Sequence, residues 1–94
     1  MPVYVDNYYK YTASHFGRIR MSHMFADSEE ELDTMAEKLK LKPKWKQGKG
    51  PVAYFDIGMS KRQDAIAYGA KEVTCQEMVK IRKRIREKHV KHNV

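Results

Sequence analysis

The sequence has a single cysteine, Cys75, and no long apolar run. One cysteine excludes an internal disulfide framework and an all-thiolate zinc site, and it fits a reducing compartment. No stretch approaches the roughly 18 to 20 apolar residues that a bilayer span needs. The N-terminus also lacks the basic and then apolar layout of a signal peptide. We therefore expect a cytoplasmic protein with no membrane partner.

Several catalytic motifs are missing as well. The sequence contains no nucleophile elbow, no Walker phosphate loop and no full dinucleotide fingerprint, so the enzyme classes that need them have no support. Zinc requires three or more convergent ligands, and magnesium requires a carboxylate cluster. His23, Asp27 and Asp56 could converge, but no motif spacing demands it. We expect no metal and no other cofactor.

The charges are separated along the chain. The formal net charge is +7, from 19 basic and 12 acidic residues. Residues 27–37 are acidic and contain no base, whereas residues 38–49 and 80–91 are strongly basic. This distribution favours a polyanion as partner, or a second copy of the chain docked acidic face to basic face.

Length and pattern predict a small α/β domain. With 94 residues and 41% apolar content, residues 1–94 can form one domain with a packed core and one pocket. β-Branched and aromatic segments predict strands at 2–5, 18–26 and 52–57, with a brief strand near 72–74. Strand-helix-strand units then favour one small sheet with about three helices packed on it.

Helix boundaries follow from capping residues. Ser28 and Glu31 form a capping box that starts the first helix, and Pro43 is expected to stop it. The buried face of this helix is predicted to consist of Leu32, Met35, Ala36 and Leu39. The second predicted helix runs from Ser60, which is expected to cap it, to Tyr68. The third is strongly basic and runs from about residue 75 to 88, followed by a frayed tail over 89–94.

The turn from the strand at 52–57 into the next helix predicts an anion site. Gly58 leads into Ser60, Lys61 and Arg62, which would direct free N–H groups, a hydroxyl and two cations at one spot. Cations in the first turn oppose the helix dipole unless an anion offsets them. The alternative is that Ser60 caps the helix and both cations lie in solvent, neutralised by Asp56.

Other candidate ligand-binding residues lie on neighbouring segments. His23 lies on an apolar strand, where it is either a hydrogen-bonded core residue or an acid–base group, and Asp27 follows it. Ligands of α/β sheets bind beyond the carboxyl ends of strands, where 23–27 and 56–62 would meet. Trp45 offers a flat face and Gln47 an amide for binding a base-like ring. Alternatively, Trp45 is buried as an anchor of the core.

The aromatic segment at residues 8–17 is the remaining candidate. It holds three tyrosines, one histidine and one phenylalanine without a clear period, which predicts a loop. Such a loop is either a binding surface that could close as a lid or a cap on the core. The sequence leaves both open.

Five short motifs resemble a family of short bacterial and phage proteins catalogued as domain of unknown function 4031. The motifs are Met1–Asp6, Ser22–Asp27, Trp45–Gln47, Tyr54–Asp56 and Ser60–Arg62, and the resemblance covers nearly the whole chain. Tyr54 replaces a histidine of the family pattern and Lys46 replaces a phenylalanine, which weakens proposals that need a histidine pair. The resemblance implies a shared sequence pattern but no particular reaction. If a phage encodes the chain, the protein is expected in the cytoplasm of the host.

Three functions remain in view. The first is a non-enzymatic binding protein whose pocket holds a phosphorylated, nucleotide-like ligand, for example a phage protein that sequesters a host nucleotide. Its ligand-binding residues would be Ser60, Lys61, Arg62, His23, Asp27, Trp45, Gln47 and Asp56. The second is a nucleic-acid-binding accessory protein that uses Arg82, Lys83 and Arg86 of the basic helix. The third is a weak phosphoesterase or phosphotransferase with His23 and Asp56 as acid and base.

Overall fold

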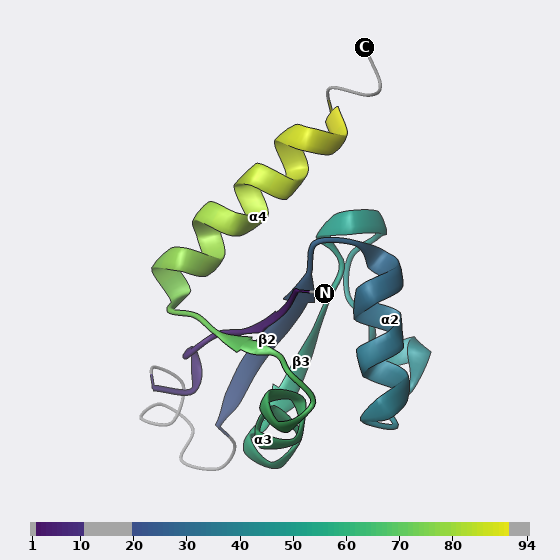
Figure 1. Ribbon diagram of the computed structural model, residues 1–94, viewed down its shortest axis with the longest axis vertical. Helices are drawn as coiled ribbons and strands as arrows, with labels where there is room; N and C mark the ends of the chain where they lie inside the picture. Colours follow the sequence, from purple (N-terminus) through teal and green to yellow (C-terminus); the bar gives the residue numbers. More distant parts are fainter. Residues whose placement is uncertain (1, 11–19, 91–94) are drawn as a thin grey trace.

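The computed structural model describes residues 2–10 and 20–90, with only the backbone of residues 89 and 90. Its centre is a mixed four-stranded sheet in the order β3-β2-β1-β4 (Figure 1). The strands are β1 (Val3–Val5), β2 (Met21–Ala26), β3 (Tyr54–Gly58) and β4 (Lys71–Glu72). β2 is antiparallel to both β1 and β3, and β4 is parallel to β1. The predicted α/β class is confirmed.

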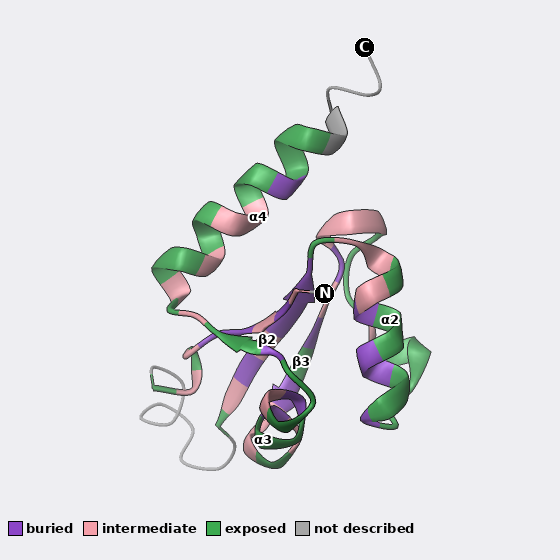
Figure 2. Cartoon of the chain, in the orientation of Figure 1, coloured by how far each residue is buried: buried purple, intermediate pink, exposed green. Residues whose placement is uncertain are grey.

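Helices cover both faces of the sheet. They are α2 (Glu29–Lys38), α3 (Met59–Ala67) and α4 (Cys75–Val90), and two short 3-10 helices, η1 (Pro43–Trp45) and η2 (Gly50–Val52), lie between α2 and β3. α2 and α3 pack on one face, while α4 crosses the other face and extends past the sheet (Figure 1). Buried positions gather in the strands and on the inner side of α2 (Figure 2), so the main core lies between the sheet and α2 and α3. No helix among the described residues is long and apolar enough to span a bilayer.

α2 has the predicted start and buried face, but it ends early. Ser28 Oγ accepts the N–H of Glu31 at 3.2 Å, which confirms the predicted cap, but the Glu31 carboxylate accepts the Ser28 hydroxyl at 2.9 Å and not the Ser28 N–H of a full capping box. The four predicted core positions, Leu32, Met35, Ala36 and Leu39, are all buried. The prediction that Pro43 stops the helix is wrong, because Lys40 already adopts a left-handed conformation with φ 60°. Pro43 instead begins η1.

The start of α3 also differs from the prediction. Gly58 is the N-cap residue and makes no side-chain cap, while Ser60 lies inside the first turn and is exposed. The predicted cap at Ser60 is therefore wrong. β3 runs directly into α3, because Gly58 keeps an extended conformation at the junction, with φ −77° and ψ 177°.

The sheet topology corrects one expectation about the site. β2 and β3 are antiparallel, so their carboxyl ends lie at opposite edges of the sheet. The expectation that residues 23–27 and 56–62 meet beyond the carboxyl ends of the strands is therefore wrong. Instead, the register places His23 directly beside Asp56 in the middle of the sheet.

α4 is anchored at its first turn. The N–H of Glu77 donates to Thr74 Oγ1 at 3.0 Å, and the N–H of Thr74 donates to Glu77 Oε1 at 2.8 Å, which confirms the expected helix start. Asn7 Oδ1 accepts the N–H of Cys75 at 2.9 Å and so joins the end of β1 to α4. The helix continues to Val90, two residues beyond the predicted end. Residues 91–94 of the predicted tail, and residues 11–17 of the aromatic loop, lie outside the described residues.

Candidate functional site

A row of polar side chains crosses the sheet from β1 to beyond β3. It consists of Asp6, His23, Asp56 and Gln47. Met24 and Phe55 of the same strands point into the core, and side chains alternate along a strand, so His23 and Asp56 lie on the opposite face. Gln47 Nε2 donates to Asp56 Oδ2 at 3.1 Å at the far end of the row. We call these four residues the polar row.

Asp6 is the buried anchor of the polar row. Its exposed fraction is 0%, and its carboxylate accepts the N–H groups of Tyr8 at 3.1 Å and His23 at 2.9 Å. The second carboxylate oxygen lies 2.6 Å from His23 Nδ1. Burial raises the pKa of Asp6, but the hydrogen bonds from His23 and Tyr8 outweigh burial and hold the pKa below its usual value.

His23 is held between two aromatic rings. The ring centroids of Tyr8 and Tyr54 lie 4.8 Å and 5.5 Å from that of His23. Its Nε2 lies 3.6 Å from Asp56 Oδ1. The hydrogen bond to Asp6 raises the pKa of His23, burial lowers it, and the charges of both carboxylates add to the increase. The net direction is upward, which favours the imidazolium form.

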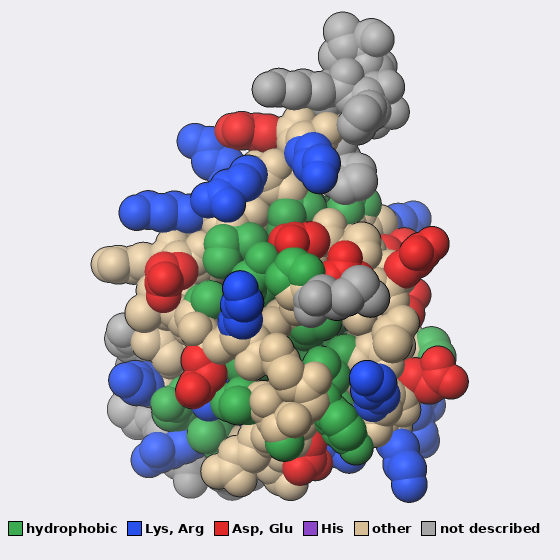
Figure 3. All heavy atoms as spheres, viewed as in Figure 1, with side chains coloured by type: hydrophobic (Ala, Val, Ile, Leu, Met, Phe, Trp, Pro, Cys, Tyr) green, Lys and Arg blue, Asp and Glu red, His purple; other side chains and the backbone are tan. Residues whose placement is uncertain are grey.

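A cationic groove adjoins the polar row. It has a volume of about 530 Å³ and is lined by Tyr54, Met78, Val79, Arg82, Lys83 and Arg86. The Arg82 guanidinium lies 4.8 Å from the Tyr54 ring centroid and donates to the Val52 carbonyl. Tyr54 therefore contacts both His23 and Arg82 and joins the groove to the polar row. Figure 3 shows further Lys and Arg side chains along α4. We call this the α4 groove.

Two of the three residues of the predicted anion cradle are bound to the protein itself. Lys61 Nζ donates to the Leu39 carbonyl at 2.8 Å and so caps the end of α2. Arg62 is only 5% exposed and donates to the Asp6 carbonyl at 3.1 Å and to Glu72 at 3.1 Å. Both cations thus have internal partners, which offsets the unfavourable dipole interaction that motivated the prediction. Ser60 is exposed and joins neither contact.

Asp27 and Trp45 lie away from the polar row. Asp27 follows β2 four residues after His23, a separation of about 13 Å along an extended strand, and accepts the Tyr4 hydroxyl at 3.1 Å. Trp45 is 48% exposed on η1, with Lys42 Nζ 5.5 Å from the ring centroid, so it is not a core anchor. Of the predicted residues, the structure brings together His23, Asp56 and Gln47.

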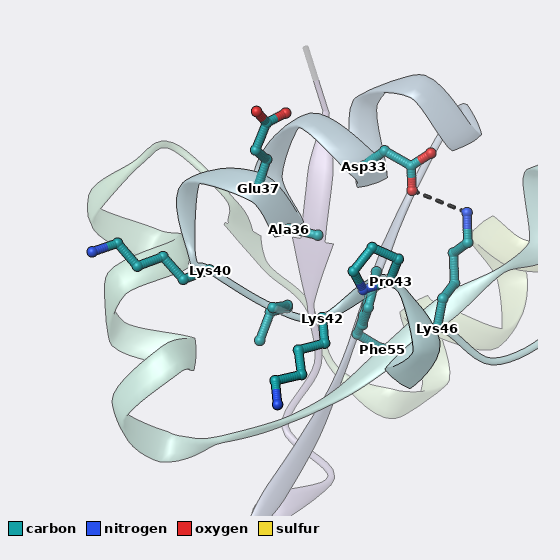
Figure 4. Close-up of a pocket in the computed structure, with 9 residues that line it drawn as sticks. Asp33, Ala36, Glu37, Lys40, Lys42, Pro43, Lys46 and Phe55 are labelled. Carbon is teal, nitrogen blue, oxygen red and sulfur yellow. Dashed lines mark hydrogen bonds and ion pairs between the residues drawn. The ribbon is translucent and has the colours of Figure 1, made fainter.

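A second cavity of about 550 Å³ lies between α2 and η1, with Phe55 among its lining residues (Figure 4). Figure 4 shows Lys46 reaching toward Asp33 across its mouth. Lys46 pairs with Glu29 at 2.8 Å and with Asp33 at 3.0 Å. Lys46, from the basic segment 38–49, therefore pairs with two acidic residues of the same chain. Part of the opposite charge that suggested a second copy as partner is thus neutralised within one chain.

Metal and thiol chemistry find little support in the part of the chain that the structure describes. Residues 2–10 and 20–90 contain no group of three His, Cys, Asp or Glu side chains placed to hold a metal ion. Burial and the nearby charge of Asp6 raise the pKa of the Cys75 thiol, so the thiolate is scarce at neutral pH. Cys75 acts as the first residue of α4.

The comparison with protein families gives one match. The family model described as Protein of unknown function (DUF4031) matches residues 3–85. The chain belongs to this family. The searches of curated proteins and of solved structures found no match.

Asp6 is the site residue that sequence reasoning missed. Its position beside Asn7 at the end of a strand suggested only a strand terminator. A usable signal was present, because Asp6 closes the opening motif Met1–Asp6 that carries part of the resemblance to the DUF4031 family. An acid that ends one motif and a histidine at the centre of the next, Ser22–Asp27, would have suggested the pair that the structure shows.

Proposed function

We propose that the protein binds a phosphorylated, nucleotide-like ligand in the α4 groove. The observation that carries this proposal is the groove lining, which presents three basic side chains and no acidic one beside an aromatic ring. Arginine and lysine recognise phosphate through charge-assisted hydrogen bonds. Met78 and Val79 add an apolar wall on which a base-like ring can lie.

The proposed anion site lies on α4 rather than at the start of α3. Lys61 and Arg62 are engaged by the Leu39 and Asp6 carbonyls. Lys83 and Arg86, in contrast, are exposed on the groove. A phosphate between these two side chains would leave the ring of the ligand near Tyr54. A reducing compartment such as the cytoplasm suits the free thiol of Cys75.

Calorimetry and thermal shift against a panel of nucleoside mono-, di- and triphosphates and cyclic nucleotides test this proposal. We expect at least one compound to raise Tm, and the Lys83→Gln/Arg86→Gln double variant to weaken its binding about 10-fold to 100-fold, because two charge-assisted hydrogen bonds are lost. Lys44→Gln, which removes an exposed lysine on η1, is the matched control and should bind normally. If no phosphorylated compound binds, or if Lys44→Gln weakens binding equally, the proposal is wrong.

A nucleic acid is the second candidate ligand, and the charge beyond the groove favours it. Further exposed bases lie along α4, namely Lys80, Arg84 and Lys88. A strand of several phosphates could contact more of these residues than one nucleotide can, and its affinity would fall steeply with salt. Binding of an oligonucleotide at least 100-fold tighter than that of a mononucleotide at the same salt concentration would favour this candidate. Equal affinities would favour the single nucleotide.

A further inference from the structure

The Asp6–His23 pair fixes the direction of an imidazole. The Asp6 carboxylate is immobilised by two backbone N–H groups and lies 2.6 Å from His23 Nδ1. The rings of Tyr8 and Tyr54 flank the imidazole. With Nδ1 held by Asp6 and two tyrosine rings in contact with the imidazole, Nε2 points along the polar row toward Asp56. This is the arrangement by which a buried carboxylate orients a histidine for proton transfer.

His23 Nε2 is left available for a ligand. Within residues 2–10 and 20–90 it has no hydrogen-bond partner, since Asp56 Oδ1, at 3.6 Å, lies beyond hydrogen-bond distance. The His23 side chain keeps 21% of its surface exposed. A histidine with only a structural role would need no open nitrogen beside a second carboxylate. The exposed Asp56 accepts the Gln47 amide on Oδ2, while its Oδ1 faces His23 Nε2 as an ion pair at 3.6 Å, with no hydrogen bond between the two.

We propose that His23 and Asp56 hydrolyse a phosphodiester bond of the ligand whose phosphate is held by Lys83 and Arg86 of the α4 groove, beside Arg82. This inference rests on the proposed function, because the α4 groove must first bind the phosphate. Tyr54 contacts both His23 and Arg82, at 5.5 Å and 4.8 Å between the groups, so the acid–base pair and the cations adjoin one another.

The reaction balances with water as the only co-reactant. Asp56 accepts a proton from a water molecule whose oxygen forms the new bond to phosphorus. The ester P–O bond breaks, and the Nε2–H of the His23 imidazolium donates its proton to the departing oxygen, giving an alcohol and a phosphomonoester. The proton on Asp56 then returns to Nε2 across the 3.6 Å that separates the two groups. Asp6 acts as a positioning residue and does not contact the substrate.

The charge around His23 selects a diester over a monoester. The groups that face His23 are Asp6 from the end of β1, Asp56 and Tyr54 from β3, Tyr8, and Arg82 from α4. Asp56 carries a negative charge at the point where water must attack. A diester phosphate has one negative charge and a monoester about two near neutral pH, so Asp56 repels the diester less.

Hydrolysis of a dinucleoside monophosphate and of a 3′,5′-cyclic mononucleotide, followed by chromatography and phosphorus NMR, tests the inference. We expect hydrolysis of at least one of the two by the wild-type protein. His23→Gln should lower the rate at least 100-fold while the affinity for the same compound changes less than 3-fold. Lys44→Gln should leave both unchanged. Binding without hydrolysis, or hydrolysis that survives His23→Gln, overturns the inference and leaves the proposed function standing. If neither diester binds, the inference is wrong, and the proposed function falls with it only if the whole nucleotide panel also fails to bind.

The pH profile separates positioning from structural roles. Activity should fall at high pH as the His23 imidazolium loses the proton that it donates to the departing oxygen. Asp6→Asn should move the alkaline limb to lower pH, because the carboxylate that favours the imidazolium is gone. Circular dichroism and Tm show whether this variant folds. If it does not, Asp56→Asn carries the test, and it must lower the rate about 100-fold while binding is kept, because a rate that survives this change contradicts the role of Asp56 as the base.

Discussion

The Asp6–His23 pair joins two titratable side chains whose pKa values move in opposite directions on folding. Each stabilises the charged form of the other across 2.6 Å, and the backbone N–H groups of Tyr8 and His23 reinforce the charge on Asp6. A charged pair of this kind in a sheet costs desolvation, which its hydrogen bonds offset only when all of them are made. The buried carboxylate meets this condition, since its side-chain and backbone partners fill both oxygens.

The Asp6–His23 pair should make its largest contribution to stability between about pH 4 and pH 6.5. The pKa of His23 is raised, so its contribution is complete below the ordinary value of about 6.5 and is lost as the pH rises through the folded-state pKa. The pKa of Asp6 is lowered, so its contribution is complete above the ordinary value of about 3.9 and is lost as the pH falls through the folded-state pKa.

Tm of the wild-type protein and of His23→Gln, measured from pH 4 to pH 9, tests this. We expect the difference in Tm to be largest near pH 5.5 and to shrink as the pH rises above about 6.5 through the raised pKa of His23. Comparison with Lys44→Gln removes the effect of pH on the rest of the protein, because this lysine is exposed on η1. A difference that grows with pH would show that the His23 contact is stronger with the neutral ring.

At the scale of elements, the ends of helices are the least predictable part of this chain. α2 ends because Lys40 turns left-handed with φ 60°, with the N–H of Leu41 bonded to the Ala36 carbonyl at 2.9 Å. Glycine is the usual residue at such a position, since a side chain there meets the following carbonyl. Lys61 Nζ supplies the remaining cap on the Leu39 carbonyl.

Lys40→Gly should therefore stabilise the protein by about 0.5 to 1 kcal/mol, through relief of the left-handed backbone. In a domain of this size the gain corresponds to a rise in Tm of at least about 2 °C. Lys40→Ala removes the same charge but keeps a β-carbon, so it should give no increase. An equal increase in both variants would assign the effect to charge rather than to backbone conformation.

Local patterns predicted the elements, and distant contacts decided the site. The helix caps at Ser28 and Thr74 and the apolar period of α2 are encoded within a few residues, and the structure has them all. Asp6 and His23 are 17 residues apart, and Arg62 reaches the Asp6 carbonyl over a separation of 56 residues. Neither pairing leaves a local signal. For this reason the cations near residue 60 were assigned to a ligand although they fasten the fold.

At the scale of the whole molecule, positive charge is concentrated on α4, where few acidic side chains lie nearby to neutralise it. The net charge is +7, and the acidic helix α2 is partly neutralised by Lys46 through Glu29 and Asp33. α4 carries six of the 19 basic residues and extends past the sheet (Figure 1). Arg86 lowers the pKa of Arg82 by repulsion, after the larger effect of burial. Like charges in the α4 groove therefore repel one another, and an anion bound there would reduce this repulsion.

Salt should consequently stabilise the protein. Raising NaCl from about 20 mM to about 500 mM shortens the Debye length from roughly 20 Å to roughly 4 Å and screens this repulsion, so Tm should rise by a few degrees. The increase should be smaller in the Lys83→Gln/Arg86→Gln variant, which has lost two of the repelling charges. The control is the Lys44→Gln/Lys71→Gln double variant, which loses two exposed lysines outside α4 and should show the larger increase. A fall in Tm with salt would mean that attractive pairs such as Lys46 with Glu29 outweigh the repulsion on α4, and that the α4 groove needs no counter-ion to be stable.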